Sequence, residues 1–385
     1  MFDSTQSGAR TRRGAKAALS LATSLIALTG VWASAQAAET RSFVVSYFYD
    51  ANYSDGKTDC PNGMNMSSID FYRRDLLRVG LSKEKVEEAL KDFPGEGGLS
   101  QPWVPLVMTR GNGKDNVYTN PETAPDPGLI TVSGKHSYGF NLDGKSGKND
   151  FIEPDTKQTG IDNQMYRVMG CVRSYRGLPP PGRPSLVENL WDVLRDVAPA
   201  WIISVSSQDS LSKDGDVTIT FTRALERITR DASGAAAQAD MTYQMDPDKR
   251  SHNVMKGKIK NGVVTVDKPH EFHMIFDPYM MAEYNLTKAQ MRLELKADGT
   301  ARGYIGGYLP WRDFFYSIAN QGHIKEYATS IDVPGLYYAL KRNADADPDP
   351  KTKENRRISA AYQIEAVRAF VVDPAASQTA DAAQR

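Results

Sequence analysis

The chain has 385 residues, with 47 lysines and arginines against 47 aspartates and glutamates, and therefore carries no formal net charge. This balance leaves no basic surface for nucleic acid or for an anionic membrane, and we expect neither as a partner. With 40% apolar and 24% charged residues, the composition is that of a globular protein and excludes a largely disordered chain.

Residues 1–37 have the three parts of a cleaved secretory signal. Four basic residues precede the uncharged apolar run 17–33, and two A-x-A sequences then end at Ala35 and Ala37. The run is shorter than the roughly 20 residues that span a bilayer. We therefore expect an exported protein, periplasmic or extracellular, with no stable membrane insertion after cleavage. Thr11-Arg12-Arg13 resembles part of a twin-arginine signal, but Gly14-Ala15-Lys16 lacks the apolar pair that should follow, so the general secretory and twin-arginine routes both stay open.

A proline-rich stretch, residues 178–184 (LPPPGRP), is typical of a stiff linker and divides the rest of the chain. We expect an N-terminal α+β lobe over residues 38–178 and a β-sandwich-like domain with C-terminal helices over residues 185–373. A disordered tail is expected over residues 374–385. Directly after the linker, a capping box that starts at Ser185 predicts a helix through Val197.

The N-terminal lobe is predicted to combine short helices with isolated strands. The β-branched and aromatic run Phe43–Tyr49 predicts a strand. Helices are expected over Ser68–Val79 and over the residues that follow the N-cap Ser82. Pro102–Met108 is apolar but interrupted by proline, so it is at most an edge strand. A short strand is expected over Leu129–Val132.

The chain contains two cysteines, Cys60 and Cys171, both in the expected exported part. In an oxidising compartment an even pair predicts a disulfide. Closing a loop of about 110 residues would destabilise the unfolded chain by roughly 4–5 kcal/mol. The alternative is a pair of buried free thiols.

Residues 139–164 form a loop rich in aspartate, asparagine and glycine. Its candidate metal ligands are six side chains with the oxygen atoms that calcium prefers, namely Asp143, Asn149, Asp150, Asp155, Asp162 and Asn163. The segments NLDG, NDF, PD and GIDN within the loop resemble the aspartate-rich calcium loops of thrombospondin type 3 repeats. This resemblance implies Ca²⁺ as a cofactor. The alternative is that aspartate and asparagine simply build turns, and that Asp162 favours the positive N-terminus of the following helix.

The same loop contains Gly139-x4-Gly144-Lys145-Ser146, which matches the letters of a phosphate-binding P-loop. That motif requires a helix that begins at the lysine, whereas here Gly147 follows the serine and Pro154 comes before any helix. We therefore reject phosphate binding. A helix is expected only later, over residues 161–172, where apolar residues form one stripe at helical spacing.

After the linker helix the sequence is mainly β. Strands are expected at Trp201–Ser206, Val217–Thr222, Met241–Met245, Lys256–Lys260, Val263–Val266, Phe272–Phe276, Gln290–Lys296 and Ala301–Tyr308. Polar and apolar residues alternate in QMRLELK, which is typical of an antiparallel sheet with one buried face. Asn261-Gly262 and Asp298-Gly299 are predicted to form type I′ turns.

The C-terminal part returns to helix before a last strand. Helices are expected over residues 311–321 and after the N-cap Asp332, and a strand over residues 358–372 that joins the main sheet. The predicted fold class is therefore mainly β (α+β). Its core is an antiparallel β-sandwich or barrel, with helical additions in the N-terminal lobe and at the C-terminus.

Two further groups of residues are candidate sites. His270 and His273 are the nearest pair of histidines, but on a strand they point to opposite faces, which disfavours a metal or catalytic role. Tyr304, Tyr308 and Trp311 lie among glycines and are a candidate platform on which a sugar ring stacks. The alternative is that these three aromatic side chains fill the core.

These observations favour an exported, disulfide-linked, non-catalytic binding or structural module. We expect it to be calcium-stabilised and to contact a glycan or another component of the cell envelope. One alternative is a secreted hydrolase that uses carboxylates or the strand with His270 and His273. Another is a purely structural scaffold. No sequence motif assigns a specific ligand, and whether the chain is an enzyme stays open.

Overall fold

The structure is a computed structural model that describes residues 38–95, 100–176, 197–275 and 283–373. The predicted signal segment 1–37, the linker and helix predicted over 178–196, and the tail 374–385 lie outside these residues. Those features, and the domain boundaries drawn from them, stay predictions. Among the described residues, no helix is long and apolar enough to cross a membrane.

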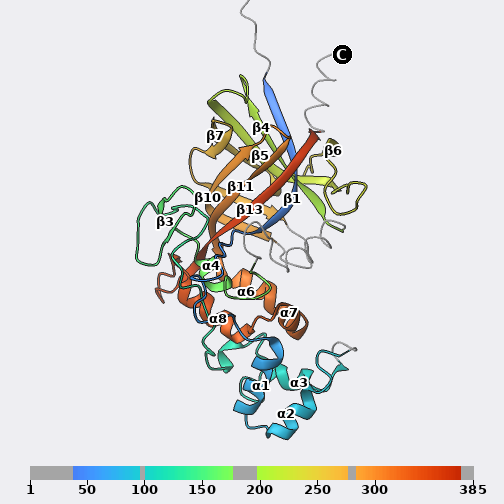
Figure 1. The fold of residues 1–385 in the computed structure, drawn as a ribbon, viewed down its shortest axis with the longest axis vertical. Coiled ribbons are helices and arrows are strands. Elements are labelled where there is room, and N and C mark those ends of the chain that lie inside the picture. The colour runs from blue at the N-terminus through green and yellow to red at the C-terminus, as the bar shows by residue number, and fades with distance from the viewer. Residues whose placement is uncertain (1–37, 96–99, 177–196, 276–282, 374–385) are drawn as a thin grey trace, which may run out of the picture. The chain divides into compact units, whose positions relative to one another are not determined.

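The core of the fold is a closed antiparallel barrel of eight strands (Figure 1). The strands follow one another in the order β1-β4-β5-β7-β8-β10-β11-β13, and β13 pairs with β1 to close the ring. Their bounds are β1 Glu39–Asp50, β4 Pro199–Ser207, β5 Gly215–Arg227, β7 Asn253–Lys260, β8 Val263–Val266, β10 Glu283–Leu295, β11 Thr300–Pro310 and β13 Asn355–Val372. The predicted mainly β fold is thus confirmed, as the barrel and not the sandwich.

Three additional strands pair with members of the ring. β6 and β12 pair with β13, and β9 pairs with β10. Their bounds are β6 Met241–Gln244, β9 His270–Ile275 and β12 Ala346–Pro348. The pairing of β6 with β13 is parallel, whereas the other two are antiparallel.

The first strand closes the barrel because it pairs on both sides. Ser42 of β1 aligns with Ser204 of β4 on one side and with Ala369 of β13 on the other. An irregularity between Val45 and Tyr47 interrupts its register with β13. A strand predicted within the N-terminal part is therefore one wall of the barrel.

The barrel interior is filled by large side chains. Phe48 meets Trp201 edge-on and stacks on Tyr362, in both cases with ring centroids 5.0 Å apart. Trp201 in turn contacts Phe221, with the ring centroids 5.8 Å apart. Contacts of this kind pack a core without leaving a channel. At the end of β1 stands the half-buried Asp50, whose pKa is raised to about 7 by the loss of water around its carboxylate.

Only one of the two predicted type I′ turns is formed. Asn261 (φ 50°) and Gly262 (φ 79°) both have positive φ between β7 and β8, as this turn requires. Between β10 and β11 only Gly299 does (φ 82°). There the side chain of Asp298 accepts a hydrogen bond from Thr300 N at 2.9 Å and closes a different turn. The prediction of a second type I′ turn is therefore wrong.

The helices are minor additions to the barrel. Their bounds are α1 Ser68–Arg78, α2 Lys83–Leu90, α3 Val104–Met108, α4 Gln164–Met169, α6 Trp311–Ala319, α7 Gly322–Thr329 and α8 Val333–Asn343, with 3-10 turns at Pro121–Thr123 and Lys249–Ser251. Both predicted caps are confirmed, because Ser82 accepts a hydrogen bond from Lys85 N and Asp332 accepts one from Gly335 N. α4 and α8 pack against β13.

Two local predictions in the N-terminal part are wrong. Pro102–Met108 contains helix α3 rather than an edge strand, because Pro105 occupies the first turn, where a missing N–H is tolerated. Leu129–Val132 forms no regular strand. The backbone of Ile130 is satisfied instead by the side chain of Asn65, which both donates to Ile130 O and accepts from Ile130 N.

A buried cluster of charges joins the N-terminal helices to α7. Arg110 is fully buried and forms ion pairs with Asp75 of α1, at 3.3 Å, and with Glu326 of α7. Its guanidinium carbon lies 5.2 Å from the ring centroid of Tyr72 and 5.6 Å from that of Tyr118. Burial raises the pKa of Glu326, and the charge of Arg110 offsets part of this rise. We call these five residues the arginine clamp.

Candidate functional site

The aspartate-rich loop, residues 139–163, is fixed to the barrel at both of its ends. Near its start, Phe140 docks on Gly306 of β11. A Cβ atom at position 306 would lie 2.8 Å from the Phe140 ring, so this approach requires glycine. At the other end, Gln164 N donates a hydrogen bond to Ser359 Oγ of β13 at 2.9 Å. The loop is thus held against two neighbouring strands.

Within the loop, carboxylate oxygens accept hydrogen bonds from backbone amides. Asp143 accepts from Lys145 N at 2.8 Å, and Asp150 accepts from Gly147 N. These are the side-chain turns expected as the alternative to calcium binding. No helix begins at Lys145, which agrees with the rejection of a P-loop.

The tripeptide Asp162-Asn163-Gln164 links the loop to α4. Asp162 is 6% exposed and accepts a hydrogen bond from Leu142 N at 2.7 Å. Asn163 is the N-cap of α4 and donates a hydrogen bond to Tyr138 O at 3.0 Å. The helix predicted over residues 161–172 is present but shorter, because Asn163 caps its start and Gly170 is its C-cap.

Asp345, which the sequence interpretation missed, brings another carboxylate to the loop. It follows α8 and accepts hydrogen bonds from Ser359 N at 2.7 Å and from Ser359 Oγ at 2.6 Å. Although Asp345 as a whole residue is exposed, Ser359 is fully buried and also accepts from Gln164 N. No local sequence motif identifies Asp345, because it is far from the loop in sequence and comes near it only when the chain folds.

Four carboxylates therefore gather where the loop meets β13. Burial raises the pKa of Asp162 to about 7. The hydrogen bond from Leu142 offsets part of this rise, whereas the charges of Asp143, Asp150 and Asp345 add to it. Burial also raises the pKa of Asp345 to about 6. Neither Asp162 nor Asp345 has an ion-pair partner among the described residues. We call these four aspartates the acidic corner.

The six predicted calcium ligands have different surroundings in the structure. Half of them lie in the acidic corner. Of the others, Asn163 caps a helix, Asn149 accepts a hydrogen bond through its backbone carbonyl, and Asp155 has an exposed side chain. In the described part of the chain, no group of three or more His, Cys, Asp or Glu side chains is arranged to hold a metal ion.

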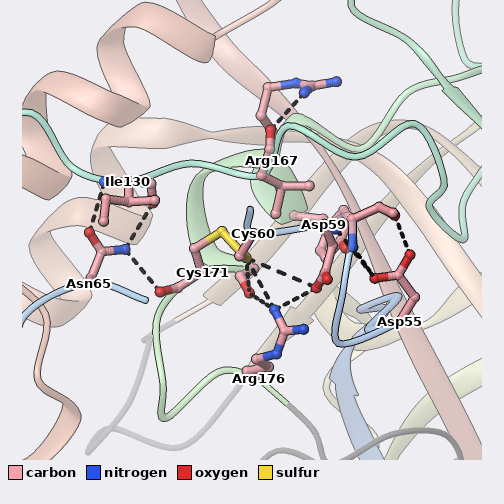
Figure 2. Close-up of a disulfide and its surroundings, with 12 residues drawn as sticks. Asp55, Asp59, Cys60, Asn65, Ile130, Arg167, Cys171 and Arg176 are labelled. Atoms are coloured by element: carbon pink, nitrogen blue, oxygen red, sulfur yellow. Dashed lines mark hydrogen bonds and ion pairs between the residues drawn. A yellow bond between two sulfur atoms is a disulfide. The ribbon is translucent and has the colours of Figure 1, made fainter. Parts of the chain in front are cut away.

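The predicted disulfide is formed between Cys60 and Cys171, whose Cα atoms are 5.9 Å apart (Figure 2). Arg176 points toward this bond, and its Nη1 atom pairs with Asp59 Oδ2 at 2.5 Å. Asn65 donates a hydrogen bond to Cys171 O at 3.0 Å. The segment that precedes α1 is therefore held against the residues that follow α4.

A second group of side chains lies on the outer wall of the barrel, next to the loop. Glu153 of the loop is fully buried and pairs with Arg292 of β10 at 3.1 Å. The guanidinium carbon of Arg292 lies 5.6 Å from the ring centroid of Tyr304 of β11. Tyr304 stacks on Tyr138, with ring centroids 5.1 Å apart and ring planes inclined by 14°. Both tyrosines are half-buried.

The exposed platform expected from Tyr304, Tyr308 and Trp311 is not formed. Tyr308 is 5% exposed and Trp311 is 2% exposed. Trp311 begins α6, donates a hydrogen bond to Asn355 O at 2.9 Å and packs against Tyr337 of α8. Large aromatic surfaces favour such burial, so only Tyr304 of the three remains half-buried at the outer wall.

The two histidines of β9 are separated by the geometry of their strand. His270 and His273 stand three residues apart and so face opposite ways. His273 Nε2 lies 2.9 Å from Glu283 Oε2, and His273 Nδ1 lies 2.8 Å from Arg250 O. Neighbouring residues therefore contact both ring nitrogens of His273.

No protein family model, curated protein or solved structure matches this chain. Function is therefore inferred from the acidic corner, the disulfide and the outer wall of the barrel.

Proposed function

We propose that this chain is an exported, non-catalytic binding module that is stabilised by calcium and contacts a glycan or another component of the cell envelope. The observation that carries the proposal is the acidic corner. Burial and neighbouring negative charge raise the pKa of Asp162 to about 7 and that of Asp345 to about 6. A divalent cation stabilises the charged forms of both carboxylates and removes this energetic cost.

Calcium suits this corner better than a smaller ion. It takes six to eight oxygen ligands in a flexible geometry, and it accepts backbone carbonyls and water as well as carboxylates. The acidic corner offers the carboxylates of Asp143, Asp150, Asp162 and Asp345. They are not arranged as a metal site in the structure, so calcium binding requires them to move toward one another. Asp143 is exposed and Asp150 half-buried, so the turns that they close can adjust around an ion. The glycine-rich loop supplies carbonyl oxygens beside them.

The calcium part is tested by thermal unfolding of the mature, disulfide-intact protein, first with a chelator and then with calcium in excess. We expect calcium to raise the Tm, because a ligand that binds only the folded state stabilises it, and we expect magnesium to raise it less. Asp345→Asn should remove most of the gain. Asp216→Asn, which changes an exposed aspartate paired with Lys258, should leave it intact. Identical melting curves with and without calcium would contradict this part.

Export is supported by the disulfide, because such bonds persist in oxidising compartments and are rare in the cytosol. Cell fractionation with mass spectrometry should find the protein outside the cytoplasm, oxidised at Cys60 and Cys171. Its N-terminus should follow Ala35 or Ala37. A cytoplasmic protein with both thiols reduced would overturn the proposal of export.

Binding is tested by co-sedimentation of the purified protein with isolated cell-envelope polysaccharide. We expect the protein to sediment with this material and to release no sugar from it. Release of reducing sugar would favour the hydrolase alternative instead. A protein that stays in the supernatant would contradict the binding module.

A further inference from the structure

We propose that four aromatic side chains on the outer wall of the barrel form a binding surface for a sugar ring. They are Tyr53, His136, Tyr138 and Tyr304, and we call them the aromatic arc. This inference rests on the proposed function, because it names the ligand class of the binding module as a pyranose unit of a polysaccharide. It also replaces the buried Tyr308 and Trp311 with residues that lie at the surface.

The arc is one continuous surface built from separate segments of the chain. Tyr304 of β11 stacks on Tyr138 at 5.1 Å between ring centroids, Tyr138 meets Tyr53 at 6.0 Å, and Tyr53 meets His136 at 5.6 Å. All four side chains are half-buried. Each ring is thus packed in part and accessible in part, and it offers apolar surface to the C–H face of a pyranose.

The polar tips of the arc are unpaired. The hydroxyl groups of Tyr53, Tyr138 and Tyr304 and the imidazole of His136 have no hydrogen-bond partner among the described residues. Asp155 is exposed, and its carboxylate also has no partner there. Besides burial, the charge of Asp155 contributes to raising the pKa of both Tyr138 and Tyr304. Sugar hydroxyl groups need donors and acceptors of this kind next to a ring face.

Some tyrosines outside the arc use their hydroxyl groups differently. Tyr49 donates to Glu365 at 2.6 Å, Tyr118 donates to Glu326, and Tyr338 donates to Ala124 O at 3.0 Å. Those hydroxyl groups are used to hold the fold together. The hydroxyl groups of the arc remain available to a ligand.

Neighbouring contacts hold the arc in place. Ser137, between His136 and Tyr138, accepts a hydrogen bond from Asn163 Nδ2 at 3.1 Å. On the other side, the ion pair with Glu153 fixes Arg292 next to Tyr304. A preorganised surface loses little conformational entropy on binding. The loop therefore supports the arc, whose own residues precede the loop or lie on β11.

The chemistry of the arc favours a sugar over other ligand classes. The carboxylate of Asp155, which is exposed and has no ion-pair partner among the described residues, opposes the phosphates of nucleic acid. An apolar lipid chain or an apolar helix would cover three phenol groups and an imidazole without satisfying them, which is unfavourable. A pyranose offers both an apolar face and a ring of hydroxyl groups.

The test is isothermal titration calorimetry of the full mature protein with cello-, chito- and malto-oligosaccharides. We expect the wild type to bind at least one of these series. Tyr138→Ala should weaken that binding by roughly tenfold, because it removes the central ring of the arc. Asp155→Asn should weaken it by about threefold through one lost charged acceptor. Because the Asp155 side chain is exposed and unpaired, this second variant should fold normally.

The matched control is Tyr316→Ala, which removes a tyrosine that is 50% exposed on α6, outside the arc. It should bind as the wild type does. Binding of none of the three series, or full binding by both Tyr138→Ala and Asp155→Asn, would overturn the assignment of the arc. If those two variants still sediment with envelope polysaccharide, the proposed function survives and only the arc is wrong. If the wild type does not sediment either, both are wrong.

Discussion

Two groups of buried acids in this protein are compensated in opposite ways. In the arginine clamp, Glu326 and Asp75 face Arg110, whose charge is permanent. In the acidic corner, Asp162 and Asp345 accept hydrogen bonds from backbone amides and a serine hydroxyl, and their further neighbours are other carboxylates. Each group contains a buried carboxylate whose pKa burial raises, Glu326 in the clamp and Asp162 in the corner, but only the corner accumulates negative charge.

Because of this difference, the clamp stabilises the fold under all conditions that keep its ion pairs, whereas the stability of the corner depends on a bound proton or cation. Opposite charges of fixed sign hold two elements together, and the loss of either partner leaves an unpaired buried charge. Like charges that are brought together are stable only when a proton or a cation neutralises them. The corner therefore couples folding stability to pH and to added ions, whereas the clamp contains its own permanent cation.

The largest effect is expected from Arg110→Met, which removes the cation of the clamp. Glu326 would stay buried without an ion-pair partner among the described residues, whereas Asp75 keeps Arg74 and Arg78, and the free energy of unfolding should fall by about 3–5 kcal/mol. Urea unfolding at neutral pH measures this change. The control is Arg73→Ala, which breaks the exposed pair with Glu87 at 2.7 Å and should cost less than about 1 kcal/mol. An equal loss of unfolding free energy in the two variants would show that the buried ion pairs of the clamp stabilise the fold no more than an exposed pair does.

A smaller effect of opposite sign is expected from Asp162→Asn in the presence of chelator. The pKa of Asp162 is raised from 3.8 to about 7 in the folded state, so the folded state holds its proton more tightly than the unfolded state does. The stability from this proton is fully present below the unfolded pKa and is lost as the pH rises through the folded pKa. The variant should match the wild type near about pH 4 and exceed it by about 2 kcal/mol near about pH 8.

Asp248→Asn is the control for this pH dependence. Hydrogen bonds from Arg250 lower the pKa of Asp248 to about 2, so neutralising it should bring no gain in stability at the higher pH. Urea unfolding across the pH range compares both variants with the wild type. An Asp162→Asn protein that is less stable than the wild type near about pH 8 would mean that the charged carboxylate is well compensated, and the contrast with the clamp would fail.

The smallest effect is expected from Arg292→Met. Its partner Glu153 is compensated both by this cation, as in the clamp, and by backbone amides, as in the corner. Glu153 is fully buried, accepts hydrogen bonds from Asp155 N at 2.8 Å and Thr156 N at 2.5 Å, and pairs with Arg292. Burial raises its pKa, but these donors outweigh burial and lower it. The amides remain in the variant, so the loss should be about 1 kcal/mol. A loss in urea unfolding as large as that of Arg110→Met would show that amides cannot replace a cation.

Most of the barrel could be predicted from local sequence pattern. Polar and apolar residues alternate in Gln290–Lys296 because one face of β10 is buried and the other is not. The caps Ser82 and Asp332 were found because a single side chain closes each helix start. The disulfide followed from the number of cysteines and the expected compartment.

Contacts between distant segments could not be predicted in this way. Nothing local shows that Phe43–Tyr49 pairs with the last strand. Asp345 stands in an acidic stretch typical of an exposed loop, and only the fold brings it to Asp162. The platform fails because Tyr308 and Trp311 are buried, Trp311 against Tyr337 of α8. The aromatic arc draws on residues from other segments.

The pairing of β1 with β13 also determines when the barrel can form. Ser42 and Ala369 are register partners from opposite ends of the described chain, so the ring cannot close until the last strand is available. The hairpins β7–β8 and β10–β11 need only local contacts and can form earlier, whereas long-range pairing is slow. Until closure, β1 and β13 each keep an open hydrogen-bonding edge. A chain that emerges N-terminus first therefore carries an incomplete barrel, open to chaperones and to proteases, until its final strand arrives.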